Sequence, residues 1–163
     1  MTSRGNWYYT SWKGNLDKSG GIATNIGVHF FDMLTWIFGS PISNTVHVNS
    51  HDRAGGFLKL KNANVRWFLS INENLLPKHI KKIGQRTFRS ISIEGKELEF
   101  SGGFTELHTK SYNQILSGNG FGVNETRNAI ELVHNIRHSK PESLSGDYHP
   151  LSNEKLTNHP FLK

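Results

Sequence analysis

The feature that most constrains the fold is a nearly uninterrupted apolar stretch at residues 21–38, GIATNIGVHFFDMLTWIF. It is too long for an ordinary strand. Gly39-Ser40-Pro41, which follows directly, is a typical stop signal for a helix. We therefore expect a buried helix between Gly20 and Gly39.

Three polar side chains, Asn25, His29 and Asp32, interrupt this stretch. At about 100° per residue they fall within roughly 60° of arc, one turn above another. Burying such groups without partners costs about 1–3 kcal/mol each. The stripe therefore predicts one of two arrangements. In one, His29 is a core histidine hydrogen-bonded to Asp32. In the other, the stripe lines a site where Asp32 orients His29 to exchange a proton with a substrate hydroxyl.

Gly20 and Gly21 stand where this helix begins. Glycine leaves backbone N–H groups bare at the positive end of a helix, so a hydroxylated or anionic ligand could approach closely. The two glycines therefore favour the site over the core histidine.

The rest of the chain predicts an α+β fold in which an open, predominantly antiparallel sheet is flanked by helices. Asn6 to Trp12 is aromatic and β-prone, which indicates a strand. After Pro41, short runs alternate apolar and polar residues, as in a meander with one buried face. These runs lie at residues 44–49, 56–61, 65–72, 87–94, 96–100 and 105–109.

Helices return in the last third, at residues 111–116 and 124–138. In the second of these, Ile130, Val133 and Ile136 share an apolar stripe. The tail from Pro141 onward is polar and irregular. With no internal repeat and no linker, residues 1–163 are expected to form a single domain.

Composition narrows the function classes. The chain has no cysteine, which excludes disulfides, thiol nucleophiles and cysteine zinc sites, and it favours a reducing compartment such as the cytoplasm. We find no signal peptide and no stretch that would span a membrane, so no membrane partner is expected. The formal charge of +6 suggests an anionic partner.

Three weaker patterns were weighed for binding. The basic stretch Lys78–Arg86 is interpreted as a solvated loop, with a phosphate, an acidic sugar or nucleic acid as alternatives, and no nucleic-acid motif accompanies it. The histidine pairs His47/His51 and His134/His138 lack a local third ligand, so no metal is expected. The loop at residues 118–122, GNGFG, resembles a phosphate cradle but is not the GxGxxG fingerprint of dinucleotide sites.

The segment from Ser19 to Asp32, SGGIATNIGVHFFD, resembles the GG-x-x-x-D/N-x-G-x-H-x-x-D signature of the Gfo/Idh/MocA oxidoreductases. Further segments resemble a narrower subgroup, which dehydrogenates UDP-N-acetylglucosaminuronate at C3 in the synthesis of bacterial lipopolysaccharide O-antigens. These segments are RGNWY at 4–8, SWKG at 11–14, ELHT at 106–109, GFG at 120–122 and HPLS at 149–152. The resemblance covers nearly the whole chain.

The resemblance implies the C-terminal α+β domain of that family, which is similar to the one in glyceraldehyde-3-phosphate dehydrogenase. Family members open with a Rossmann domain that binds NAD and supplies a lysine to the active site, and this sequence lacks it. We therefore expect an excised C-terminal half, inactive alone and without NAD of its own. Its expected partners are the UDP-sugar, the missing Rossmann domain and a second copy of the chain.

That second copy is expected on the face of the sheet, because the apolar alternation around Val65 to Ile71, with Trp67 and Phe68, suits a strand buried on both faces. Core filling within one chain would also explain the alternation.

By the same resemblance, His29 is the acid/base at the sugar C3 hydroxyl, and Asn25 stands where aspartate is common and contacts substrate hydroxyls. Asp32, Gly20 and Gly21 belong to the substrate site. Arg4 and Lys13 are candidates for the carboxylate and the diphosphate.

Two alternatives remain at this point. One is a domain of the same family for another sugar or polyol. The other is a non-catalytic module for anion binding or assembly, whose affinity would follow the Lys78–Arg86 stretch and fall with salt.

Overall fold

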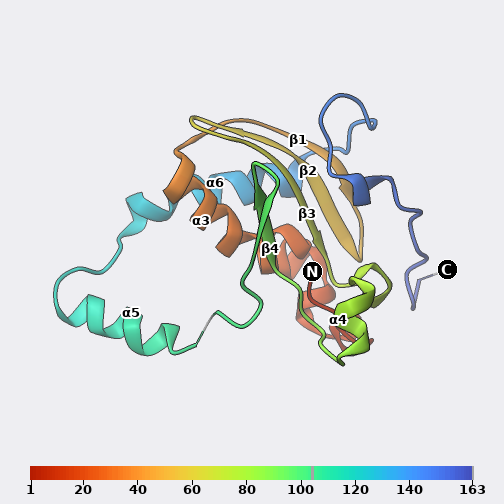
Figure 1. Cartoon of the computed structure of the whole chain (residues 1–163), viewed down its shortest axis with the longest axis horizontal. Coiled ribbons are helices and arrows are strands. Elements are labelled where there is room, and N and C mark those ends of the chain that lie inside the picture. The colour runs from red at the N-terminus through yellow and green to blue at the C-terminus, as the bar shows by residue number, and fades with distance from the viewer. Residues whose placement is uncertain (104, 163) are drawn as a thin grey trace.

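The alternating runs after Pro41 build the central layer, a three-stranded antiparallel sheet in the order β1-β2-β3 (Figure 1). Its strands are β1 (Pro41–Asn49), β2 (Arg53–Leu60) and β3 (Asn64–Ser70). A tight turn, closed by the Leu60 N–H on the Ala63 carbonyl at 2.8 Å, connects β2 to β3. The computed structural model describes residues 1–103 and 105–162. The first three predicted strands are confirmed.

The apolar stretch forms one helical segment with an irregular start. A π-helical turn (η2, Ala23–Gly27) leads into α3 (Val28–Phe38), and Gly39 ends the helix with φ of 86°. α3 packs beside α6 (Val123–His138), and together they cover one face of the sheet (Figure 1). The core lies between these layers and includes Phe31, Leu58, Leu69, Leu132 and Ile136. Both predicted helices are confirmed, but Ile130 is 55% exposed, and Ala129 and Leu132 take its place on the buried face.

The predicted single meander is wrong. Strands β4 (Ser90–Ile93) and β5 (Lys96–Glu99) form a separate two-stranded sheet, connected by the turn at Glu94 and Gly95. The reason is the connection between β3 and β4. After Ile71 the chain turns away into η3 (Glu73–Leu75) and α4 (Lys78–Lys82), so the basic stretch predicted as a loop contains a short helix.

Helix α5 (Leu107–Leu116) lies away from the rest of the molecule, and every one of its residues is exposed (Figure 1). The strand predicted at residues 105–109 is therefore wrong, and the helix predicted at 111–116 begins earlier than expected. Because its side chains are exposed, α5 is held mainly by its own backbone bonds.

The N-terminal segment is the second wrong strand. Asn6 to Trp12 folds into α1 (Trp7–Thr10), followed by η1 (Trp12–Gly14) and α2 (Leu16–Ser19). Tyr8 is 3% exposed and belongs to the core cluster. Packing of that one ring outweighs the preference of aromatic residues for strands.

The tail is tied to the sheet through a buried ion pair. Asp52 and Arg53 are each 1% exposed, and Arg53 Nη2 contacts Asp52 Oδ2 at 2.8 Å. Thr157 donates to Asp52 Oδ2 at 2.9 Å, and Arg53 donates to the Glu154 carbonyl at 3.2 Å. Just before this point the tail forms η4 (Pro150–Asn153), where His149 stacks on Phe68 with ring centroids 5.2 Å apart.

This tail contact bears on the prediction that β3 is buried on both faces. Trp67 and Leu69 face the core, while the other face of β3 at Phe68 is partly covered by the chain's own His149. Part of the apolar alternation is therefore explained within one chain. Across residues 1–103 and 105–162, no helix has the length and apolar character needed to cross a bilayer.

Candidate functional site

Two glycines shape the entrance to the helix that carries the candidate site. Gly20 and Gly21 have φ of 75° and 81°, a left-handed conformation that favours glycine. A Cβ on Gly20 would lie 2.6 Å from Thr24 Oγ1, and one on Gly21 would lie 2.9 Å from Leu16 Cδ1. Both positions therefore require glycine because of conformation and crowding, in addition to any contact with a ligand.

The π-helical turn holds Asn25 in place. Asn25 Nδ2 donates to the Gly21 carbonyl at 3.2 Å and to the Lys13 carbonyl at 3.3 Å. Short π-helical turns are rare and are often found at functional sites. The bond to Lys13 joins the predicted residues Asn25, Lys13 and Gly21 in one cluster.

Tyr8 belongs to the same cluster, although the sequence analysis did not select it. Its hydroxyl is buried and has no well-formed hydrogen bond to the described residues. Burial raises the pKa of Tyr8, against smaller opposite effects of the neighbouring Asn25 and Arg4. Tyr8 therefore places a buried hydroxyl next to the Asn25 side chain. Its signal in the sequence was the aromatic run, which was read as a strand.

His29 and Asp32 are exposed, so the expectation of a buried polar stripe is wrong for these two residues. Within the part of the chain that the structure describes, no hydrogen bond joins His29 to Asp32. Asp32 therefore does not orient the His29 ring as expected. The physical reason is that one face of this helix lies against the core through Phe31 and Leu34, while the side chains of His29 and Asp32 point away from that core into solvent. The polar stripe is the open side of the helix.

The two predicted cations lie over indole rings. Arg4 Cζ is 5.8 Å from the centre of the Trp7 ring, and Lys13 Nζ is 5.8 Å from that of Trp12. The backbone N–H of Arg4 donates to the Ile71 carbonyl at 3.0 Å, which fixes its position beside the end of the sheet. Such contacts preserve the charge of both side chains and restrict their motion.

Arg89 was also missed by the sequence analysis. Burial, and then the charge of the nearby Arg4, lower the pKa of Arg89. Arg89 Nη1 donates to the Ser101 carbonyl at 3.0 Å. Two guanidinium groups brought near each other favour an anion between them.

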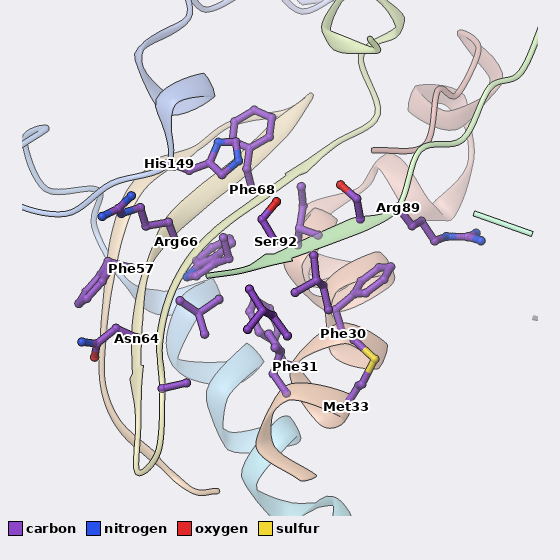
Figure 2. Close-up of a pocket in the computed structure, with 18 of the residues that line it drawn as sticks. Phe30, Phe31, Met33, Phe57, Asn64, Arg66, Phe68, Arg89, Ser92 and His149 are labelled. Carbon is purple, nitrogen blue, oxygen red and sulfur yellow. The ribbon is translucent and has the colours of Figure 1, made fainter. Parts of the chain in front are cut away.

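A cavity lies elsewhere among the described residues. It has a volume of about 860 Å³ and lies between α3, β3 and β4, lined mainly by apolar side chains such as Phe30, Phe31 and Trp67 (Figure 2). Neither Asn25 nor His29 lines it. The candidate site is therefore an open surface around the start of the helix, and the cavity requires a separate explanation.

The weaker patterns do not add to this site. His138 Nδ1 bonds to the His134 carbonyl at 2.8 Å, and among the described residues no three His, Asp or Glu side chains gather as a metal site would require. The loop at residues 118–122 is irregular, and its Phe121 contacts Trp36 edge to face, with ring centroids 5.3 Å apart.

With this geometry in hand, the comparison with known proteins decides the family. The sequence profile of the C-terminal alpha/beta domain of the Gfo/Idh/MocA oxidoreductase family matches residues 1–101. The chain belongs to this family. The expected fold class is confirmed as well, because antiparallel sheets flanked by helices form this Gfo/Idh/MocA domain.

Two solved structures are similar to this Gfo/Idh/MocA domain. Both are of the WlbA (WbpB) dehydrogenase from Thermus thermophilus, one in complex with NAD and alpha-ketoglutarate and the other with NAD and UDP-GlcNAcA. The first is 46% identical with a TM-score of 0.88, over 92% of this chain and 49% of that chain. The second is 44% identical with a TM-score of 0.88, over 93% and 49%. The chain thus spans about half the length of these relatives.

Within this Gfo/Idh/MocA domain, the predicted site residues divide into two groups. Asn25, Lys13, Gly20 and Gly21 lie together around the π-helical turn, where Asn25 bonds to Lys13 and Gly21, and a Cβ on Gly20 would touch Thr24. Arg4 is near enough to this group to act on Tyr8. His29 and Asp32 are on the next turns of the same helix and face solvent. Their roles in binding or chemistry remain predictions.

Proposed function

We propose that this chain is the substrate-binding half of a cytoplasmic, NAD-dependent dehydrogenase that oxidises the C3 hydroxyl of UDP-N-acetylglucosaminuronate for bacterial lipopolysaccharide O-antigen synthesis. The supporting observation is a polar, open helix face that carries the family signature, beside a fixed Asn25 and two cations. Support also comes from the 44% identity to a dehydrogenase solved with NAD and UDP-GlcNAcA.

His29 is the proposed proton acceptor. Oxidation of a secondary alcohol to a ketone removes a proton from the oxygen and a hydride from the carbon. Imidazole exchanges protons near neutral pH, and an exposed ring on an open helix face can reach a bound sugar. His29 takes the proton from O3 as the C3–O bond becomes a carbonyl.

Asn25 and Tyr8 position the sugar. Both N–H groups of the Asn25 amide point to carbonyls of the chain, one on Gly21 and one on Lys13, which leaves Oδ1 to accept a bond from a substrate hydroxyl. The Tyr8 hydroxyl supplies the complementary donor. An acceptor and a donor held side by side suit neighbouring hydroxyls of a pyranose ring.

The anionic parts of the substrate are assigned to the cations. Arg4 and Lys13, with Arg89 nearby, suit the uronate carboxylate and the diphosphate, while Gly20 and Gly21 let the ligand approach the backbone. Asp32, one turn after His29, completes the polar face and accepts from a sugar hydroxyl.

NAD would supply the hydride acceptor for this oxidation. The sequence contains no GxGxxG fingerprint, and it covers 49% of the dehydrogenase chains that were solved with NAD. We therefore assign NAD to a Rossmann domain outside this chain and expect the chain alone to be inactive.

The deciding experiment is the His29→Ala variant of the full-length enzyme. We expect kcat to fall by about 10²- to 10⁴-fold, the usual contribution of a general base, with substrate affinity nearly unchanged. His134→Ala, an exposed histidine on α6, is the matched control and should retain full activity. Full dehydrogenase activity in His29→Ala would overturn the proposal.

The assignment of NAD to another domain and of the sugar nucleotide to this one is tested on the 163-residue chain itself. Calorimetric titration with NAD should show no tight binding, whereas titration with UDP-GlcNAcA should show weak binding that Arg4→Ala reduces. Tight NAD binding by this chain would contradict the assignment of the cofactor to another domain.

We further propose that two copies associate through the sheet face opposite α3. Phe57 lies half-buried on this face, and its cross-strand neighbour Arg66 is paired with Asp147 of the tail. Phe57→Lys should then shift the assembly toward monomer in sedimentation experiments, and an unchanged distribution would exclude this face.

A further inference from the structure

Two open sheet edges border the large cavity on opposite sides. β3 is the last strand of the three-stranded sheet, and β4 belongs to the hairpin. The cavity of about 860 Å³ lies between them, with Phe30, Phe31 and Met33 of α3 along one side (Figure 2). The described residues thus leave a groove between two strands.

The register of β3 shows which backbone groups face this groove. In an antiparallel ladder, alternate residues bond to the partner strand. Leu60 bonds to Ala63, and the Ile71 N–H donates to the Asp52 carbonyl at 3.0 Å, so the odd-numbered residues between them bond to β2. The N–H and C=O groups of Asn64, Arg66 and Phe68 therefore point to the groove.

The register of β4 is complementary. The Phe100 N–H donates to the Arg89 carbonyl at 2.9 Å, so the residues that alternate with Arg89 bond to β5. The backbone groups of Ser90 and Ser92 point the other way, toward the groove. Among the described residues, no backbone bond from outside the hairpin reaches either serine.

Residues 1–4 already lie between these two edges as a short strand. Successive residues bond alternately to one side and to the other, which is the pattern of a strand in the middle of a sheet. On the β4 side, the Met1 nitrogen donates to the Phe88 carbonyl (2.6 Å), the Phe88 N–H donates to the Met1 carbonyl (2.9 Å), and the Ser3 N–H donates to the Arg86 carbonyl (2.7 Å). On the β3 side, the Thr2 N–H donates to the Ser70 carbonyl (2.8 Å) and the Arg4 N–H to the Ile71 carbonyl (3.0 Å). Met1 itself lines the groove.

We propose that the groove is a strand site, filled by an extended segment that precedes Met1 in the full-length protein and unites both sheets into one. The order becomes β1-β2-β3, the added strand, then β4-β5, with the added strand parallel to β3 and antiparallel to β4. The inference rests on the proposed function, which requires this chain to be one part of a longer protein.

The register also fixes the chemistry of the segment. Thr2 pairs with Thr87, so the first, third and fifth residues before Met1 lie opposite Arg89, Ile91 and Ile93. This is the face of Trp67 and Leu69, against the helices, and the residues there should be apolar. The second and fourth residues exchange backbone bonds with Ser90 and Ser92 and turn their side chains to the other face.

The charge at Met1 supports a continuing chain. Burial, and then the nearby Arg89, lower the pKa of the Met1 amino group to about 6. A peptide N–H at the same place would donate to the Phe88 carbonyl without burying a charge. The surroundings therefore suit a peptide group better than an ammonium group.

The test adds six residues, Thr-Val-Thr-Val-Thr-Val, directly before Met1. This sequence turns valine toward the helices. Two controls have matched length: Val-Thr-Val-Thr-Val-Thr, which turns valine outward, and Thr-Val-Pro-Val-Pro-Val, which removes the N–H groups that would face Ser90 and Ser92. Hydrogen exchange of the Ser90 and Ser92 amides is measured by NMR in all three and in the parent chain.

We expect at least about tenfold slower exchange at both serines with the first extension only. Equal exchange in the first extension and the proline control would overturn the proposal. The proposal would also be overturned if the Ser90 and Ser92 amides were already protected in the parent chain and that chain sedimented as a dimer. A second copy of the chain would then fill the groove.

A cross-link gives an independent measurement. The chain has no cysteine, so a cysteine placed third before Met1 and Ile91→Cys form the sole possible disulfide. We expect rapid oxidation of this pair, and little with Ser90→Cys, which faces the other way; equal yields would overturn the register. Neither measurement uses dehydrogenase activity, so failure of the strand site and failure of the proposed function are distinguishable.

Discussion

The three-stranded sheet and the segments 90–103 and 105–122 differ in how far their apolar side chains are buried. We call residues 41–72 the packed region, and residues 90–103 and 105–122 the outlying region. Leu58 in the packed region is 0% exposed, while Leu98, Leu116 and Phe121 in the outlying region are 62%, 84% and 69% exposed. Both regions contain large apolar residues, but those of the outlying region stay largely exposed even where they touch another element, as Phe121 touches Trp36.

The difference teaches that burial within this chain stabilises the packed region more than the outlying region. Burial of a large apolar side chain contributes about 1.5–3 kcal/mol, which the exposed side chains of the outlying region do not gain here. Substitutions of these exposed side chains should therefore cost the folded chain less. The following predictions test this contrast by pairing the same substitution in buried and exposed settings.

The largest effect is expected at the buried ion pair. Asp52→Asn leaves Arg53 buried without its counter-charge, which costs about 3–5 kcal/mol. Asp147→Asn, in the exposed pair with Arg66, should cost about 0–1 kcal/mol. Denaturant unfolding followed by circular dichroism measures both, and similar losses would remove the contrast.

The same ion pair makes the free energy of unfolding depend on pH in the acid range. Burial raises the pKa of Asp52, but hydrogen bonds from Arg53, Asn72, Ser50 and Thr157 outweigh it and hold the pKa well below the ordinary value. The folded state therefore binds its proton only at lower pH than the unfolded state. The stabilisation is complete above about pH 4 and is lost as the pH falls below it. Asp52→Asn should abolish this acid dependence.

A matched pair of leucines gives the second prediction. Leu58→Ala should lower the free energy of unfolding by about 2–5 kcal/mol, because it opens a cavity in a fully buried site. Leu116→Ala in the outlying region should change it by less than about 0.5 kcal/mol. A large loss in Leu116→Ala would show that α5 packs on the body of this chain in solution.

The third prediction concerns close packing of the backbone. A Cβ on Gly56 would collide with the Thr45 carbonyl oxygen and lie 2.9 Å from the Trp67 ring, so Gly56→Ala should cost about 1–3 kcal/mol. A Cβ on Gly102 meets nothing within 4 Å, and Gly102→Ala should be neutral within about 0.5 kcal/mol. Thermal unfolding of the two variants measures the difference.

The smallest effect is expected at His149, where the tail meets the sheet. Burial, then Arg66 and the N-terminal charge, lower the pKa of His149, and its Nδ1 accepts a bond from the Leu151 N–H at 3.2 Å. The folded state thus favours neutral His149, so its contribution is present above about pH 6.5 and is lost as the pH falls. Proteolysis at the tail should increase below pH 6.5, and His149→Phe should remove this dependence.

The spacing of apolar residues predicted the helices and strands whose formation depends mainly on the local sequence. The helix at residues 21–38, the strands β1 to β3 and α6 followed from apolar spacing and from stop signals such as Gly39-Ser40-Pro41. The helical α1 was missed because its strand-like aromatic residues pack on the core through Tyr8. The Asp52–Arg53 pair was missed because two adjacent charged residues give no sign that the tail will cover them.

The sequence predicted which residues form the candidate site but not what surrounds each of them. The signature selected Asn25 and His29, yet an apolar helix pattern does not reveal which polypeptide covers each face, and His29 is exposed here. Tyr8 and Arg89 could not be selected, because their relation to Asn25 and Arg4 arises from tertiary contacts.

The π-helical turn at Ala23–Gly27 also limits how this helix can change length. A π-helical turn contains one more residue than an α-helical turn, so deleting one residue would restore a regular helix. That shorter helix would have better backbone bonds, and because the π-helical turn accommodates its extra residue within one turn, the segments before and after it would keep nearly the same orientation. Asn25 lies inside this turn, so the deletion would change its place on the helix and break its bonds to the Gly21 and Lys13 carbonyls. Deletions in this segment should therefore be tolerated by the fold and still disturb the Asn25 half of the proposed site.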